Sequence, residues 1–149
     1  MQKPVVRFFL TEEARNVNLV FRAPRELDAG FDLPSLEAAS IPPGGFALIR
    51  TGVHLSIPEN WVGLLRDRSS VAMRGGAITA GVIDASYRGE VKVAMHNFGK
   101  ETLQFKLGER IAQCLIVPHL PGTQSEEVSS LDDLGGTERG DGGFGSTGR

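Results

Sequence analysis

The sequence has 149 residues, 40% of them hydrophobic, which suits one domain with its own core. Its formal net charge of −2 gives no broad basic surface for a polyanionic strand, so we expect no nucleic-acid partner. Any phosphate recognition must come from a few placed Arg and Lys side chains. The single cysteine, Cys114, excludes an intramolecular disulfide and a zinc cluster of paired thiolates.

Neither a signal peptide nor a membrane segment is expected. The sequence begins Met1-Gln-Lys-Pro, and no apolar stretch typical of a signal peptide follows. The longest apolar run, Ile111–Val117, is interrupted by Gln113 and is far too short to span a bilayer. We therefore expect a cytoplasmic protein that contacts no membrane.

Short apolar segments recur along the chain between turn-forming residues, which is typical of β-strands. No window shows a long helical stripe, and Ser69–Met73 is long enough for only a turn or two of helix. This spacing predicts an all-β antiparallel sandwich or barrel. The predicted strands are Val5–Leu10, Phe46–Val53, Trp61–Leu65, Ile78–Ile83, Val91–Phe98 and Arg110–Val117.

Glycine divides the chain. Seven of the 19 glycines fall in the last fifteen positions. We therefore predict a β-domain over residues 1–118, a connector over 119–134 and a flexible Gly-rich arm over 135–149. Alone, such an arm is a solvated linker. However, closely spaced N–H groups beside Arg139, Ser146 and Thr147 can also bind a polyphosphate, and Phe144 can lie flat on a base.

The segment after the fourth predicted strand carries a candidate catalytic group. Asp84 ends an apolar strand, where a carboxylate is costly to bury unless it is paired or used. Such a carboxylate can orient and deprotonate a water, and Tyr87 can form a flat wall against a sugar. The alternative is a turn aspartate beside a buried tyrosine.

Two other segments set polar groups in suggestive places. Arg68 with Ser69 and Ser70 at a helix start can contact phosphate, although a capped helix with surface charges explains them equally well. Asp32 and Gln113 lie among apolar residues, where each can also satisfy a local backbone group.

Five segments occur in the order of the five motifs of trimeric dUTPases, so the chain resembles that family from about residue 15 to its C-terminus. Single motifs are weak, whereas five in order with suitable gaps are specific. The segments are Ala29-Gly-Phe-Asp-Leu, Arg68-Ser-Ser-Val-Ala72, Gly81-Val-Ile-Asp-Ala-Ser-Tyr-Arg-Gly89, Gly108-Glu-Arg-Ile-Ala-Gln113 and Arg139-Gly-Asp-Gly-Gly-Phe-Gly-Ser-Thr-Gly148.

The resemblance implies a jelly-roll-like distorted β-barrel that forms a homotrimer with active sites shared between subunits. It implies Mg²⁺-dependent hydrolysis of dUTP to dUMP and pyrophosphate, which limits uracil in DNA and supplies dUMP for thymidylate synthesis. Asp84 would orient the water that attacks the α-phosphorus, Tyr87 would exclude a 2′-hydroxyl, and Asp32 would hold a water of the Mg²⁺ shell. The implied substrate contacts are Arg68, Ser69, Ser70, Ile78, Gly81, Val82, Ile83, Lys92 and Gln113, with Arg139, Phe144, Gly145, Ser146 and Thr147 in a closing arm.

The chain also departs from the family pattern. Asp67 stands where many members have Pro, Val71 where Leu is usual, and Ile78 where several bacterial members have Asn. The resemblance therefore implies that uracil is recognised by backbone groups at Ile78. Ala85 and Ser86 replace the acidic pair of some relatives.

Two other functions are compatible with parts of the sequence. A dCTP deaminase shares the fold, but its catalytic Glu would fall at Ala94, which cannot transfer a proton. A non-enzymatic trimeric binding module needs none of Asp84, Tyr87 and Arg139, which are all present. Hydrolysis of dUTP is therefore the expected function.

Overall fold

Antiparallel strands make up almost all of the regular structure, in a computed structural model that describes residues 3–138. One sheet has the order β1-β4-β8-β6, formed by Arg7–Leu10, Phe46–Ser56, Glu90–Asn97 and Gly76–Thr79. A second has the order β2-β10-β5-β7, formed by Gly30–Pro34, Arg110–Pro118, Trp61–Asp67 and Val82–Ile83. A small third sheet pairs β3 (Ala39–Ile41) with β9 (Leu103–Phe105). The all-β, jelly-roll-like prediction is confirmed.

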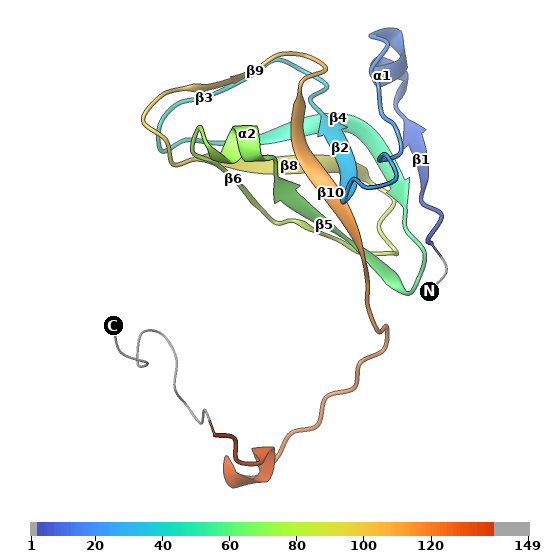
Figure 1. Ribbon diagram of the computed structural model, residues 1–149, viewed down its shortest axis with the longest axis vertical. Helices are drawn as coiled ribbons and strands as arrows, with labels where there is room; N and C mark the ends of the chain where they lie inside the picture. The colour runs from blue at the N-terminus through green and yellow to red at the C-terminus, as the bar shows by residue number, and fades with distance from the viewer. Residues whose placement is uncertain (1–2, 139–149) are drawn as a thin grey trace.

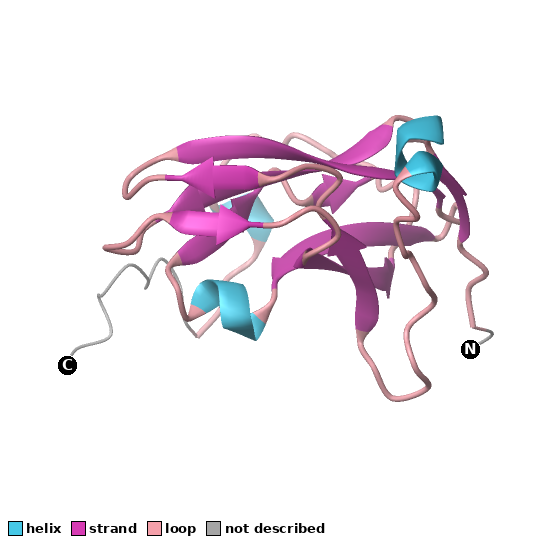
Figure 2. Ribbon diagram, turned by 90° about the horizontal axis from the view of Figure 1, so that it is seen from above, coloured by secondary structure: helices cyan, strands magenta, loops and turns pink. Residues whose placement is uncertain are grey.

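The two larger sheets face each other around one core (Figures 1 and 2). Val91, Val93 and Met95 alternate along β8 and are all fully buried, as their spacing predicts. Leu33 and Ile111 enter the same cluster from the opposite sheet. A fully buried side chain of this size contributes about 1.5–3 kcal/mol to folding, so this shared core fixes the relative position of the two sheets.

Helices are few and short. They are α1 (Glu12–Asn16), α2 (Ser69–Ala72) and the 3₁₀ turn η1 (Asp132–Leu134). Thr11 caps α1 by accepting a hydrogen bond from the Ala14 N–H at 3.2 Å. Among residues 3–138, none of the helices has the length and apolar character needed to cross a membrane.

One predicted strand was wrong. The segment Ile78–Ile83 is two strands in different sheets, because β6 ends at Thr79 and β7 begins at Val82. Between them Ala80 has φ +50°, in the left-handed region that breaks an extended chain. The Gly81 carbonyl then accepts a hydrogen bond from the Leu65 N–H at 2.7 Å, which fixes the new direction. A side chain at Gly81 would collide with the Leu65 carbonyl.

The chain leaves the sheets at Pro118, the last residue of β10 (Figure 1). Residues 120–138 are exposed along their whole length and include the apolar side chains of Leu131 and Leu134. The described part of the connector therefore buries little against its own domain.

Candidate active site

A cavity of about 1030 Å³ opens where the loop before β2, the start of α2 and the start of β10 meet. Its volume is that of a small-molecule site. Four arginines and two aspartates line it, so the cavity is locally cationic although the chain is acidic overall. The charged lining residues are Arg22, Arg25, Arg68, Arg110, Asp28 and Asp32.

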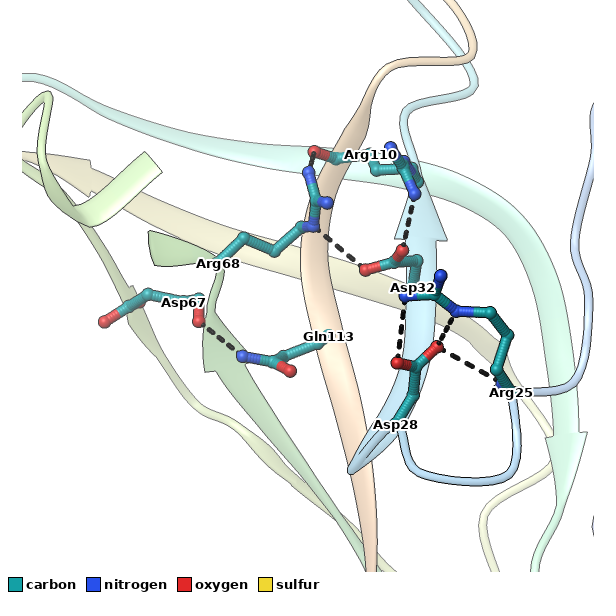
Figure 3. Close-up of polar contacts among 7 residues, drawn as sticks. All are labelled: Arg25, Asp28, Asp32, Asp67, Arg68, Arg110 and Gln113. Atoms are coloured by element: carbon teal, nitrogen blue, oxygen red, sulfur yellow. Dashed lines mark hydrogen bonds and ion pairs between the residues drawn. The ribbon is translucent and has the colours of Figure 1, made fainter. Parts of the chain in front are cut away.

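Asp32 lies between two guanidinium groups in this cavity (Figure 3). Arg68 Nε donates to Asp32 Oδ1 at 2.9 Å, and Arg110 Nη1 donates to Asp32 Oδ2 at 3.0 Å. Arg68 Nη1 also donates to the Arg110 carbonyl at 3.1 Å. These side chains are partly exposed, so the ion pairs add little stability, but they hold the arginines over the cavity.

Strand register brings these groups together. β10 pairs with β2 on one side and β5 on the other, so Gln113 lies opposite both Asp32 and Arg66. Gln113 Nε2 donates to the Asp67 carbonyl at 2.9 Å. The sequence-predicted residues Asp32, Arg68, Ser69 and Gln113 therefore line one cavity.

Arg110 is a cavity residue that the sequence analysis missed. On a regular strand, residues three apart point to opposite faces, so Arg110 and Gln113 would not share a site. The register shifts between Arg110 and Ala112, where Ile111 forms a β-bulge. This bulge allows Arg110 and Gln113 to line the same cavity.

Arg25 and Asp28, in the loop before β2, are two further cavity residues that the sequence analysis missed. Arg25 Nε and Nη2 donate to the two Asp28 carboxylate oxygens at 2.8 and 3.1 Å (Figure 3). The hydrogen bond from Arg25 lowers the pKa of Asp28, and Asp28 raises the pKa of Arg25. In sequence the pair has the spacing of an ordinary surface turn, so nothing there marked it as part of a site.

Asp84 and Tyr87 do not line this cavity. Asp84 is exposed immediately after β7, and its carbonyl accepts a hydrogen bond from the Tyr87 N–H at 3.0 Å. The Tyr87 hydroxyl donates to the Glu90 carbonyl at 3.0 Å, and 43% of Tyr87 is exposed, so it is not the buried tyrosine of the alternative reading. Gly89 permits this arrangement, because a side chain there would collide with the Tyr87 ring.

Other predicted contacts are dispersed within one chain. The Ile78 N–H donates to Asp67 Oδ1 at 2.8 Å. Lys92 is exposed on β8 opposite Arg50, and Ser70 is exposed on α2 without lining the cavity. The predicted contacts Arg139, Phe144, Gly145, Ser146 and Thr147 lie outside the described residues.

Cys114 is fully buried in β10, and burial raises the pKa of its thiol to about 12. A thiol with so high a pKa is a poor nucleophile, so Cys114 serves the packing of the core. In the described range, no three His, Cys, Asp or Glu side chains gather as they would around a metal ion held by protein alone.

Comparison with known proteins gives a family. A family model described as dUTPase matches residues 17–148. The deoxyuridine 5′-triphosphate nucleotidohydrolase of Candida albicans is 41% identical over 147 residues, which cover 93% of this chain and 91% of the relative.

Solved structures agree. The dUTPase of Staphylococcus bacteriophage 80alpha, solved with dUPNHPP, has a TM-score of 0.76 and 31% identity, covering 97% of this chain and 99% of that chain. The dUTPase of phage phi11 of S. aureus, described as coordinating a structural Mg(II) ion, has a TM-score of 0.71 and 29% identity, covering 88% and 99%.

Proposed function

The chain belongs to the dUTPase family and hydrolyses dUTP; from that premise we propose that it yields dUMP and pyrophosphate at a site shared between copies of the chain. One copy contributes the cavity around Asp32, Arg68 and Gln113, and another contributes the turn that carries Asp84 and Tyr87. The observation behind this proposal is that the cavity gathers cationic groups but is not lined by Asp84.

The phosphates are assigned to the cavity. A guanidinium binds phosphate oxygens through two parallel N–H bonds, and Arg68 is already held over the cavity by Asp32 and the Arg110 carbonyl. Ser69 lines the same cavity, as does the Gln113 side chain. We assign Ser70 and Lys92 to further substrate contacts on the family resemblance alone.

The chemistry is assigned to Asp84. Its exposed carboxylate orients a water toward the α-phosphorus and takes a proton from it during attack. Tyr87 forms the wall against the deoxyribose, which leaves no room for a 2′-hydroxyl. Backbone groups of Gly81, Val82 and Ile83 bind uracil; at Ile78 this role falls to the carbonyl, since its N–H already donates to Asp67.

Mg²⁺ is the proposed cofactor, and the residues present suit it. Mg²⁺ is commonly bound through one or two carboxylates, waters and substrate phosphates, so one cavity carboxylate suffices. Asp32 lines the cavity and would hold the ion through water. When bound, Mg²⁺ neutralises phosphate charge.

The arm at residues 135–149 is assigned to a lid on another copy in a homotrimer. It would place Arg139, Ser146 and Thr147 on the outer phosphates and Phe144 with Gly145 over uracil. The connector supports this assignment, because it leads away from its own sheets with Leu131 and Leu134 exposed (Figure 1). In a cytoplasmic setting, this activity would keep uracil out of DNA and supply dUMP.

Pyrophosphate release from dUTP, dTTP, dCTP and UTP tests this proposal. We expect turnover of dUTP in Mg²⁺, much slower release from the other nucleotides, and loss of activity in excess EDTA. Ammonia formed from dCTP, or dUTP left intact at micromolar enzyme, would refute it. Full activity in EDTA would refute only the assignment of Mg²⁺ as the cofactor.

A further inference from the structure

Asp67, the last residue of β5, makes two hydrogen bonds in different directions. Its carboxylate Oδ1 accepts from the Ile78 N–H at 2.8 Å, and its backbone carbonyl accepts from Gln113 Nε2 at 2.9 Å (Figure 3 shows the second bond). Arg68, the next residue, reaches Asp32. Asp67 therefore contacts strand β10 and the facing sheet, and it directly precedes the cavity residue Arg68.

The bond to Ile78 joins two sheets. β5 belongs to the β2-β10-β5-β7 sheet, whereas β6 is the edge strand of the β1-β4-β8-β6 sheet. An edge strand presents N–H groups that its own sheet leaves unpaired, and a partly buried N–H needs an acceptor. The Asp67 carboxylate supplies one to Ile78 on β6. Alanine or proline at position 67 would have no side-chain acceptor.

We propose that Asp67 is a positioning residue that sets the Arg68 turn and the β6–β7 segment (residues 76–83) in fixed relation to each other. The inference rests on the proposed function, in which Arg68 binds phosphate at one site and the β6–β7 segment of the same chain binds uracil at a neighbouring site. Gln113 holds the Asp67 backbone carbonyl, and the Ile78 N–H holds the Asp67 carboxylate. No side-chain hydrogen bond caps the start of α2 at Arg68, so these two bonds help to fix the chain just before it.

Asp67 has a second effect of opposite sign. A carboxylate beside a phosphate-binding arginine opposes binding of an anion. Asp67→Asn removes the charge but keeps an oxygen that can accept from the Ile78 N–H. Asp67→Ala removes both, and Asp67→Gln keeps an oxygen that is displaced by one methylene. The three variants therefore separate the effect of the Asp67 hydrogen bond to Ile78 from the effect of the Asp67 charge.

The measurements are KM and kcat for dUTP. The Kd for inorganic pyrophosphate probes the phosphate-binding part of the site separately. We expect the KM of Asp67→Asn to equal that of the parent or to be lower by up to about 3-fold. In Asp67→Ala and Asp67→Gln, KM should rise roughly 5- to 10-fold, with a smaller change in kcat. Pyrophosphate affinity should follow the same order.

Thr11→Ala is the matched control, because it also removes a side-chain acceptor from a backbone N–H, at 3.2 Å, outside the cavity. It should lower Tm without raising KM. The proposal is overturned if Asp67→Asn raises KM as Asp67→Ala does, if Asp67→Ala and Asp67→Gln leave KM unchanged, or if Thr11→Ala raises KM equally. If Asp67→Ala does not fold, the KM values of Asp67→Asn and Asp67→Gln decide the question. Should the parent not turn over dUTP, the proposed function fails, and pyrophosphate affinities still rank the variants.

Discussion

The cavity wall and the Asp84 turn are built differently. Asp32, Arg68 and Gln113 come from three elements of one chain and are held by hydrogen bonds of 2.9–3.1 Å to Arg110 and Asp67 as well as to each other. The Asp84 turn faces solvent, with Val82 61% and Tyr87 43% exposed. The chain fixes the groups that we assign to phosphate binding, and it presents the group that we assign to the chemistry on its surface.

This difference suggests separate roles for the cavity and the Asp84 turn. Groups that are to hold a triphosphate should be placed before it arrives, and the network inside one chain places the groups that we propose for this role. An exposed apolar turn with a carboxylate is completed by a surface that comes to it. In the proposed homotrimer a copy of the same chain would bring such a surface, because a closed ring of identical chains repeats one interface. Changes in the turn should therefore affect turnover and selectivity, and changes in the cavity should affect phosphate affinity.

Asp84→Asn should have the largest effect. It keeps the shape of the side chain and removes its capacity to accept a proton, so kcat should fall roughly 10²–10⁴-fold while dUTP affinity stays close to the parent value. Steady-state kinetics and titration with a non-hydrolysable analogue measure the two quantities. Glu59→Gln, another exposed carboxylate, is the control and should be silent. If the loss lies mainly in Kd, Asp84 is a binding residue.

Ending the chain at Leu134 should have the next largest effect. Removal of the proposed lid exposes the reacting phosphate to water and deletes Arg139 and Phe144, so kcat/KM should fall on the order of 10²-fold. Thermal unfolding and size exclusion should remain those of the full chain. Near-normal turnover by the shortened protein would show that the arm is only a solvated linker.

Arg68→Lys should weaken the cavity selectively. Lysine keeps the charge but loses the planar fork, so KM should rise about 10-fold with a smaller change in kcat. Arg66→Lys, at an exposed position two residues earlier on β5, is the matched control. A fall in kcat with KM unchanged would contradict the division between cavity and turn.

Tyr87→Ala should have the smallest effect on dUTP itself. If the ring is a steric wall, its removal admits the 2′-hydroxyl, and the dUTP/UTP ratio of kcat/KM should drop about tenfold. Kinetics with both nucleotides measure the ratio. An unchanged ratio would remove Tyr87 from the specificity site.

The sequence predicted the longer strands well and the short ones poorly. Strands such as β4 and β8 carry enough alternating apolar residues to be found alone. β3 and β9 have three residues each and exist because they pair with each other across more than sixty positions of sequence. The break at Ala80 was missed because a non-glycine residue with positive φ leaves no local signal.

The candidate site was predicted in part for similar reasons. Asp32 and Gln113 stood out as polar groups among apolar residues, and they line the cavity. Arg110 enters it through a bulge at Ile111, which strand periodicity does not anticipate. The separation of Asp84 from the cavity follows from the turn between the sheets, which no local pattern encodes.

The most direct test of site sharing mixes two inactive variants. Arg68→Ala disables the cavity and keeps the turn, whereas Asp84→Ala disables the turn and keeps the cavity. Each variant alone should be nearly inactive. If a site takes its cavity and its turn from different copies, random co-assembly at equal ratio gives each half intact with a chance of about one half, so roughly a quarter of sites recover.

The measurement is pyrophosphate release from dUTP after the two variants are co-refolded, with size exclusion and mass spectrometry showing mixed assemblies. We predict recovery of about one quarter of the parent activity, by the same random-assembly estimate. Mixed assemblies without recovered activity would show that Arg68 and Asp84 of one chain serve the same site, which would contradict the shared-site account and leave the hydrolysis of dUTP standing.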